Sequence, residues 1–212
     1  MEKLTSDEQE YYSLVEKAFE SLAPFYDAVT LPISQTRNIT VDFAGADTGS
    51  KILDVATGTG SQALAFAKRG YEVTGIDLTE AMLRVAKKKN QYLNLKFEIG
   101  DATDLRFGAN SFDVACISFA LHDMLPSIRE RTLREMVRVV KPGGLIIIVD
   151  YSLPVHQVGR FLIYHLISLY ESDFYRDFIH SNFAELLPRL GIEIIDELTI
   201  LLSAGKIWKA IK

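Results

Sequence analysis

Cysteine is nearly missing from this chain of 212 residues, in which Cys116 stands alone. A single cysteine excludes an intramolecular disulfide, and the four histidines are too scattered to match the spacing of a zinc site. Long hydrophobic runs are also lacking. The longest apolar stretch, residues 161–170, is short and contains His165. The sequence therefore predicts neither a metal site nor a membrane-spanning helix.

An excess of charge of one sign is lacking as well. The chain has 23 Lys and Arg against 28 Asp and Glu, a net charge of −5, with the two signs interspersed. This pattern does not provide the broad basic face of nucleic-acid-binding proteins. Residues 1–8 are too polar for a secretory signal peptide. We therefore expect a cytoplasmic protein that binds no nucleic acid and has no integral membrane segment. A homodimer is left open.

What the chain does contain is a regular alternation of strand-like and helix-like apolar patterns, without repeats or linkers. Strands are predicted at residues 51–55, 72–76, 95–98, 112–118 and 145–149, with helices at residues 8–23, 61–67, 79–86 and 129–140 and a turn at residues 141–144. Residues 192–211 read as two further strands around residues 203–205. The alternation predicts an α/β protein with a parallel, doubly wound sheet, in which ligands bind at the carboxyl ends of the strands.

Residues 54–60, between the first predicted strand and a helix, form the most informative segment. Gly58 and Gly60 allow a sharp turn and the close approach of a ligand, and the helix that follows presents free N–H groups at its start. Residues 58–63 satisfy the dinucleotide fingerprint G-x-G-x-x-A, and Asp77 lies near the expected ribose-binding position. An NAD-dependent reductase is therefore one interpretation.

The charge of Asp54 favours a different cofactor. A carboxylate at the end of the first strand would lie beside the pyrophosphate of NAD and repel it. S-adenosylmethionine has no phosphate, and it carries an ammonium and a sulfonium charge. An acidic strand end suits that cation better than it suits a dinucleotide.

Residues 52–60, Ile-Leu-Asp-Val-Ala-Thr-Gly-Thr-Gly, resemble motif I of the class I S-adenosylmethionine-dependent methyltransferases. Ala56 replaces the first glycine of the commonest version of the motif, which resembles the menaquinone and ubiquinone C-methyltransferase branch. Further segments are similar to the family at residues 23–27, 77–78, 100–102, 112–124 and 133–144. The resemblance implies S-adenosyl-L-methionine as the cofactor and S-adenosyl-L-homocysteine as its product.

The resemblance also implies roles for individual residues. Asp77 would accept the ribose hydroxyls, Leu78 would cover the adenine and Asp101 would accept from the adenine amino group. Each has a plain structural alternative, such as a helix-terminal acid for Asp77 or ordinary packing for Tyr26, which in the family covers the cofactor. The implied cofactor-binding residues are Tyr26, Asp54, Ala56, Thr57, Gly58, Thr59, Gly60, Asp77, Leu78, Asp101, Ala102, Ser118 and Phe119.

The fold implied by the resemblance is the Rossmann-like class I methyltransferase fold. It has a mostly parallel seven-stranded sheet with an antiparallel C-terminal strand and helices on both faces. Residues 192–211 are similar to its terminal hairpin, whereas a dehydrogenase would continue with a second βαβαβ half. We expect one domain over residues 1–212, with an N-terminal helical cap at residues 1–45 and a substrate-side helical insertion at residues 151–185.

The expected chemistry is an in-line displacement at a sulfonium, for which the protein aligns donor and acceptor and removes water. A general base is needed only if the acceptor loses a proton near the transfer step. His122, at the exit of the fourth strand, is the candidate base, because its pKa is ordinarily near neutrality. The alternative is a hydrogen-bonded histidine at a helix start.

The acceptor is expected to be a small apolar or aromatic molecule. Its candidate contacts are Phe161, Tyr164, Tyr170, Phe174, Tyr175 and Phe178, with His156, Arg160 and His165 as polar candidates. The aromatic residues could equally pack the helix against the sheet. Ser61 departs from the quinone branch, which usually has aspartate there, so C-, O- and N-methylation stay open. A small-molecule methyltransferase is favoured over an NAD-dependent reductase and over a catalytically silent S-adenosylmethionine-binding domain.

Overall fold

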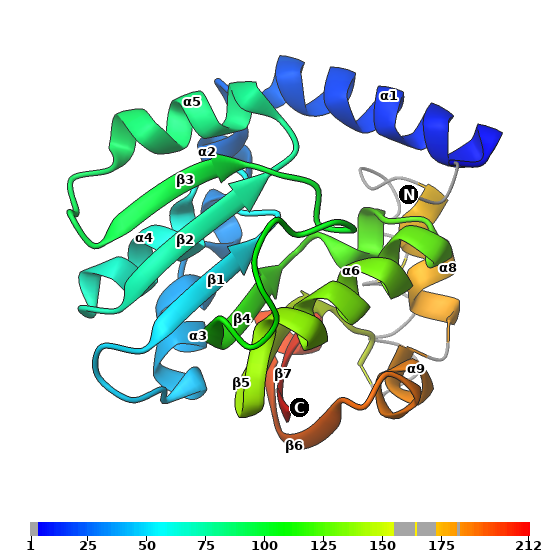
Figure 1. The fold of residues 1–212 in the computed structure, drawn as a ribbon. Helices are drawn as coiled ribbons and strands as arrows, with labels where there is room; N and C mark the ends of the chain where they lie inside the picture. The colour runs from blue at the N-terminus through cyan, green and yellow to red at the C-terminus, as the bar shows by residue number, and fades with distance from the viewer. Residues whose placement is uncertain (1–3, 155–163, 165–172, 182) are drawn as a thin grey trace.

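The structure is a computed structural model that describes residues 4–154, 164, 173–181 and 183–212. Its centre is a seven-stranded sheet with the strand order β3-β2-β1-β4-β5-β7-β6 (Figure 1). The strands are β1 (Lys51–Val55), β2 (Glu72–Asp77), β3 (Leu95–Ile99), β4 (Phe112–Ser118), β5 (Val140–Tyr151), β6 (Glu193–Ile200) and β7 (Gly205–Ile211). Strand β7 lies between β5 and β6 and runs antiparallel to both, while the other neighbours are parallel. The predicted fold is confirmed.

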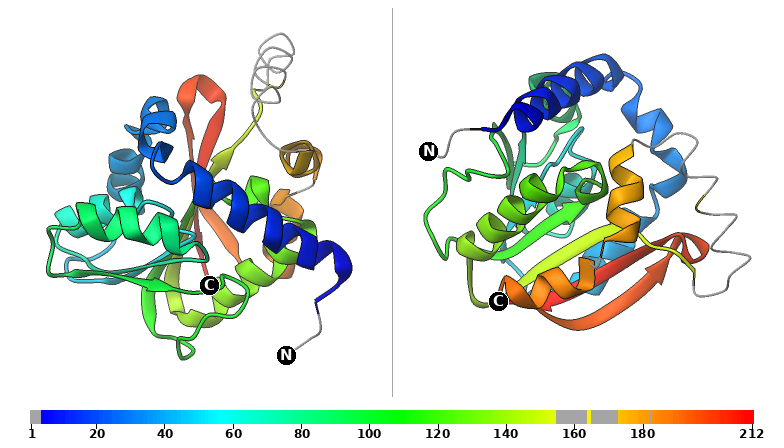
Figure 2. Two further views of the ribbon diagram at one scale, coloured as in Figure 1. Left: turned by 90° about the horizontal axis from the view of Figure 1, so that it is seen from above. Right: turned by 90° about the vertical axis from the view of Figure 1, so that its right-hand side faces the viewer.

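Helices cover both faces of this sheet. They are α1 (Ser6–Leu22), α2 (Tyr26–Val29), η1 (Leu31–Ile33), α3 (Thr36–Ala44), α4 (Ser61–Lys68), α5 (Glu80–Lys89), η2 (Leu121–Asp123), α6 (Pro126–Val139), α8 (Asp173–His180), α9 (Phe183–Arg189) and η3 (Leu201–Ser203). Helices α3, α4 and α5 pack on one face, and α6, α8 and α9 pack on the other. Helix α1 crosses above the carboxyl ends of the strands (Figures 1 and 2). Among the described helices, none combines the length and apolar character that crossing a membrane requires.

The apolar runs of the central strands explain the two-sided burial. Successive side chains of a strand point to opposite faces, so Ile52 packs under α3 and α4 while Leu53 packs under α6. Both side chains are fully buried. Each contributes about 1.5–3 kcal/mol when it is removed from water, which makes β1 a firm support for the loop that follows it.

Two predicted boundaries differ from the structure around α6. The helix begins at Pro126 rather than at residue 129, because proline at the first helical position loses no hydrogen bond. The turn predicted at residues 141–144 lies inside the bounds of β5 as an irregularity, at which the pairing shifts between Phe112 and Val114 on β4. Of the predicted acceptor contacts, His156, Arg160, Phe161, His165 and Tyr170 lie outside the described residues.

The glycine at the start of α4 is required by packing. Gly60 has a φ of 77°, and a Cβ atom built there would lie 2.8 Å from Cε1 of Phe97 and 2.9 Å from Cβ of Ala86. Gly49 has a similar φ of 81°, with nothing within 4 Å of such a Cβ atom. Gly60 and Gly49 therefore share a backbone conformation, but Gly60 lies in a crowded site and Gly49 in an open one.

This contrast predicts the stability of two matched variants. Gly49→Ala should lower the free energy of unfolding by about 1–2 kcal/mol, the cost of a left-handed alanine. Gly60→Ala should lose about 1–3 kcal/mol more because Phe97 and Ala86 must move. Urea denaturation of both variants measures the difference, and equal losses would contradict the packing argument.

Candidate functional site

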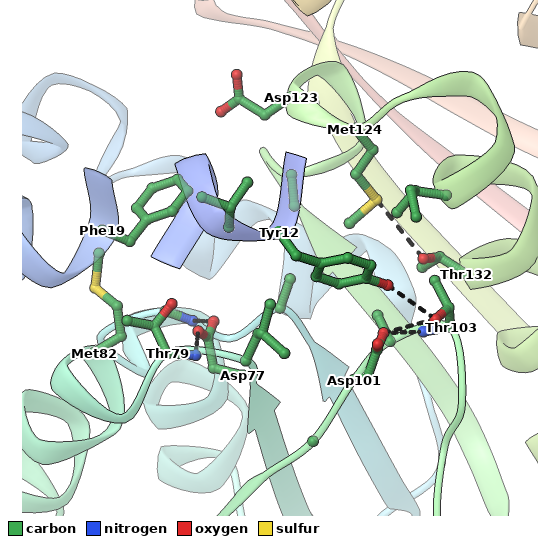
Figure 3. A pocket seen from close by; sticks show the side chains of 18 of the residues that line it. Tyr12, Phe19, Asp77, Thr79, Met82, Asp101, Thr103, Asp123, Met124 and Thr132 are labelled. Atoms are coloured by element: carbon green, nitrogen blue, oxygen red, sulfur yellow. Dashed lines mark hydrogen bonds between the residues drawn. The ribbon is translucent and has the colours of Figure 1, made fainter. Parts of the chain in front are cut away.

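Two adjoining cavities open at the carboxyl ends of the central strands. Including their mouths, they enclose about 760 and 500 Å³, and Tyr26, Ala56, Gly58 and Phe119 line both. Of the predicted cofactor-binding residues, the larger cavity is lined in addition by Asp77, Leu78, Asp101 and Ala102, and the smaller by Asp54, Thr57, Thr59 and Ser118. Gly60 lines neither cavity, since it packs against Phe97. Figure 3 shows the larger cavity.

Asp77 is held by backbone N–H groups on both of its carboxylate oxygens. Gly58 N donates to Oδ2 at 2.8 Å, and Thr79 N donates to Oδ1 at 2.9 Å. Burial raises the pKa of Asp77 in spite of these two donors. The carboxylate is thereby fixed at the end of β2 with its remaining lone pairs available to a ligand in the larger cavity.

Three N–H groups of the glycine loop are already used within the protein. Gly58 N binds Asp77, Thr57 N donates to the carbonyl oxygen of Ile76 at 2.8 Å, and Gly60 N donates to that of Thr57 at 2.9 Å. Phosphate-binding loops work by pointing such groups at the ligand. These three donors are therefore not available to a pyrophosphate.

The backbone is strained where β1 and β4 end. Ala56 has a φ of 52° and Phe119 a φ of 50°, both in the left-handed region that costs a residue with a Cβ atom about 1–2 kcal/mol. The two residues line both cavities. The conformation at Ala56 explains why glycine suits this position of the motif, and strain of this kind gathers at functional sites.

Asp54 is buried at the floor of the smaller cavity. Its Oδ2 accepts a hydrogen bond from the Thr57 hydroxyl at 2.5 Å, and the Ala63 backbone N–H also donates to the carboxylate. Burial is the main cause that raises its pKa to about 7, and the charge of Asp77 adds to the effect. The site therefore holds a carboxylate whose ionised form a cationic ligand would stabilise.

Arg37 is a site residue that the sequence analysis missed. It lies on α3 and lines the smaller cavity, where Nη2 donates to the Thr30 hydroxyl at 3.0 Å. Burial lowers its pKa from the usual range. Among the described residues that line either cavity, Arg37 is the one lysine or arginine, so the smaller cavity offers both a carboxylate and a guanidinium.

Helix α1 supplies a wall of the larger cavity that the sequence did not reveal. Tyr11, Tyr12, Val15 and Phe19 line the cavity at helical spacing. The Tyr12 hydroxyl lies 3.1 Å from Oγ1 of Thr103, whose own N–H and hydroxyl both bind Oδ1 of Asp101 (Figure 3). The apolar periodicity of residues 8–23 predicted the helix but not where it packs.

A second polar network fixes α2 over the glycine loop. Asp27 forms an ion pair with Lys89 at 2.6 Å and accepts hydrogen bonds from Thr59 and Ser61 at 2.6 and 3.1 Å. Ser61 also accepts from Lys89. Ser61, the departure from the quinone branch, is thus part of this network, which holds Tyr26 beside the loop.

His122 lies behind the larger cavity rather than in its wall. The imidazole is buried, its Nδ1 is 2.7 Å from Oδ1 of Asp150 and its Nε2 is 3.4 Å from Oδ2 of Asp123. Asp123 does line the cavity, on the opposite side from Asp77 and Asp101 (Figure 3). A direct contact of His122 with an acceptor stays a prediction. In the part of the chain that the structure describes, no group of His, Cys, Asp and Glu side chains could hold a metal ion.

Comparisons with known proteins agree with this geometry. A family model described as a methyltransferase domain matches residues 52–144. A demethylmenaquinone methyltransferase of Paenarthrobacter aurescens is 40% identical over 67% of this chain and 56% of its own length. The ubiquinone/menaquinone biosynthesis C-methyltransferase UbiE of Geotalea daltonii is 32% identical over 84% of this chain and 73% of its own length. Several relatives are matched over only 56–61% of their length.

A solved structure, that of the [4+2]-cyclase SpnF, shares the fold with a TM-score of 0.74. It is 18% identical to this chain, and the match covers 93% of this chain and 94% of the cyclase. At this identity the likeness shows the fold alone, and one fold can support different reactions.

The burial of Asp54 predicts a pH-dependent stability for the protein without ligand. Its pKa is raised from 3.8 to about 7 on folding, so the stabilisation by the bound proton is complete below about pH 4 and is lost as the pH rises through 7. The free energy of unfolding of Asp54→Asn, minus that of the parent, should therefore increase from pH 4 to pH 7 and then level off.

Chemical denaturation at a series of pH values measures this difference. Asp47→Asn is the matched control, because Asp47 is exposed and its variant should follow the parent across the range. A difference for Asp54→Asn that stays constant with pH would show that Asp54 is ionised in the folded protein throughout.

Proposed function

We propose that this chain, which belongs to the menaquinone and ubiquinone C-methyltransferase family of class I S-adenosylmethionine-dependent methyltransferases, transfers the methyl group of S-adenosylmethionine to a small aromatic acceptor. The chain spans less than two thirds of the length of several relatives, so the proposal depends on its own site. The cytoplasmic location, the homodimer and the single-domain organisation stay predictions.

The observation that carries the proposal is the use of the glycine-loop N–H groups. Thr57, Gly58 and Gly60 all donate within the protein, and Asp54 and Asp77 add acidic groups at the strand ends. A pyrophosphate would lose these three donors and would meet two carboxylates that repel it. A sulfonium cofactor without phosphate avoids both penalties, so the site supports S-adenosylmethionine over NAD.

The two cavities match the two ends of that cofactor. In the larger one, Asp77 would accept the ribose hydroxyls, and Asp101, with Oδ1 fixed by Thr103, would accept the adenine amino group. In the smaller one, Asp54 would attract the ammonium group and Arg37 the carboxylate of the methionine part. Tyr26 and Phe119 line both cavities and would exclude water where the two parts meet.

The acceptor would lie in the rest of the larger cavity. Its wall there is apolar and consists of Tyr11, Val15, Met124 and Ile128, with Asp123 as a charged group. The names of the relatives point to quinone-type acceptors, demethylmenaquinone among them. A reduced quinone ring combines a flat apolar body with hydroxyl groups, which fits such a wall.

Calorimetry with S-adenosylmethionine, S-adenosylhomocysteine and NADH tests the cofactor. The first two should bind, and Asp77→Ala should weaken them at least about 10-fold, since a hydrogen bond to a charged group contributes about 1.5–3 kcal/mol. Asp47→Ala is the control and should bind as the parent does, because Asp47 is exposed and lines neither cavity. Binding of NADH alone would overturn the proposal.

Turnover separates an enzyme from a silent binder. The protein is incubated with methyl-labelled S-adenosylmethionine and 1,4-dihydroxynaphthalene, a reduced naphthoquinone ring. A labelled methyl group bonded to a ring carbon supports the proposed acceptor class. Cofactor binding without label transfer, to this probe or to a metabolite extract, would reduce the chain to a binding domain.

A further inference from the structure

Three acidic or basic side chains form a row behind the acceptor side of the larger cavity. Asp150 at the end of β5 contacts Nδ1 of His122 at 2.7 Å, and Nε2 of His122 lies 3.4 Å from Asp123. Asp150 and His122 are almost completely buried, whereas Asp123 is partly exposed and lines the cavity. The row therefore runs from the protein interior to the cavity wall.

Resting on the proposed methyl transfer, we propose that Asp123 accepts the proton that the acceptor loses on methylation, and that His122, oriented by Asp150, takes this proton from Asp123. Asp123 is then the catalytic residue, since it faces the acceptor. His122 and Asp150 act through it as positioning residues. The acceptor class that this requires is an aromatic ring with a hydroxyl group beside the reacting carbon.

The orientation of His122 follows from the hydrogen bonds of Asp150. Oδ1 of Asp150 also accepts the Tyr151 N–H at 2.8 Å, and Oδ2 accepts the His122 N–H at 3.2 Å. Because both oxygens of Asp150 accept backbone N–H groups, we assign the contact at 2.7 Å as a hydrogen bond that Nδ1–H of His122 donates to Asp150. Nε2 of His122 lies 3.4 Å from Oδ2 of Asp123.

Arg129 holds the turn that carries His122 and Asp123. Its Nε donates to the carbonyl oxygen of Leu121 at 3.0 Å and its Nη2 to that of Met124 at 2.9 Å, one on each side of the pair. The Arg129 guanidinium is buried and also lies over the Phe178 ring at 4.9 Å. Helix α6 thus fixes η2 against the cavity.

The proposed step balances in atoms and charge. The acceptor ring carbon forms a bond to the methyl carbon, and the electron pair of the broken carbon–sulfur bond stays on sulfur as a thioether. The hydroxyl proton of the acceptor goes to the Asp123 carboxylate and then to Nε2 of His122. The proton on the methylated ring carbon moves to the ring oxygen, which restores the aromatic ring and the hydroxyl group, so one proton is released in total. The imidazolium that results lies between the carboxylates of Asp123 and Asp150, which stabilise it.

Methyl transfer to 1,4-dihydroxynaphthalene tests the row with the full chain. Asp123→Asn keeps the shape of the side chain and should lower kcat about 100-fold or more, with the Kd for S-adenosylhomocysteine within about twofold of the parent value. Asp150→Asn should lower kcat about 10-fold, and the double variant should be no slower than Asp123→Asn, because groups in one relay are not additive. Asp47→Asn should equal the parent.

Two results would overturn the proposal: a kcat for Asp123→Asn within about threefold of the parent value, or a double variant in which the losses of the two single variants multiply. The proposed function would still hold in either case, provided that the parent binds the cofactor and methylates the acceptor.

A second measurement needs no acceptor. With ¹⁵N-labelled histidine, His122, assigned through His122→Gln, should show a hydrogen-bonded Nδ1–H at low field that Asp150→Asn abolishes, and Asp123→Asn should shift Nε2. A proton on Nε2 in place of Nδ1, or an Nε2 signal indifferent to Asp123→Asn, would refute the row even if the probe is not methylated.

Discussion

Two carboxylates at neighbouring strand ends, of which Asp54 is buried and Asp77 half-buried, are the constraint on which this site depends. Asp54 and Asp77 are surrounded by hydroxyl and backbone N–H donors, and burial raises the pKa of both. Removing charge from water is unfavourable unless a partner compensates. The Gly58 N–H that holds Asp77 is lost to phosphate binding, and the acids attract a cation instead. The two carboxylates and their hydrogen bonds therefore disfavour NAD and favour S-adenosylmethionine.

The surrounding elements keep this arrangement in place. Asp27 ties α2 to the glycine loop and to α5 through Lys89, and Glu8 ties α1 to α6 through Ser127 at 2.7 Å and Arg131 at 2.9 Å. These polar contacts of Asp27 and Glu8 lie at the edge of the site, whereas the apolar clusters pack against the two faces of the sheet. The left-handed residues at the ends of β1 and β4 persist because this packing holds them.

Local patterns predicted the strands, the glycine loop and the acids at strand ends, since each depends on residues adjacent in sequence. The ligand approach predicted for Gly60 stays a prediction. Its packing against Phe97, which lies 37 positions later, carries no local signal. Arg37 and the α1 residues reach the cavities only through tertiary packing. Likewise, the pairing of His122 with Asp150 joins residues 28 positions apart. His122 could be selected as a chemical group, but its neighbours could not be read from the sequence.

The place of β7 between β5 and β6 has a consequence for how the chain folds during synthesis. Until residues 205–211 have left the ribosome, β5 has an open edge and β6 has no strand beside it. An open edge of such apolar character invites pairing with another chain. The strand that fills the gap between β5 and β6 is synthesised last of the seven. Contacts of long sequence separation must therefore form before the edge of β5 is protected. Early release of the nascent chain, or cleavage in the η3 turn, would expose the same edge and promote aggregation.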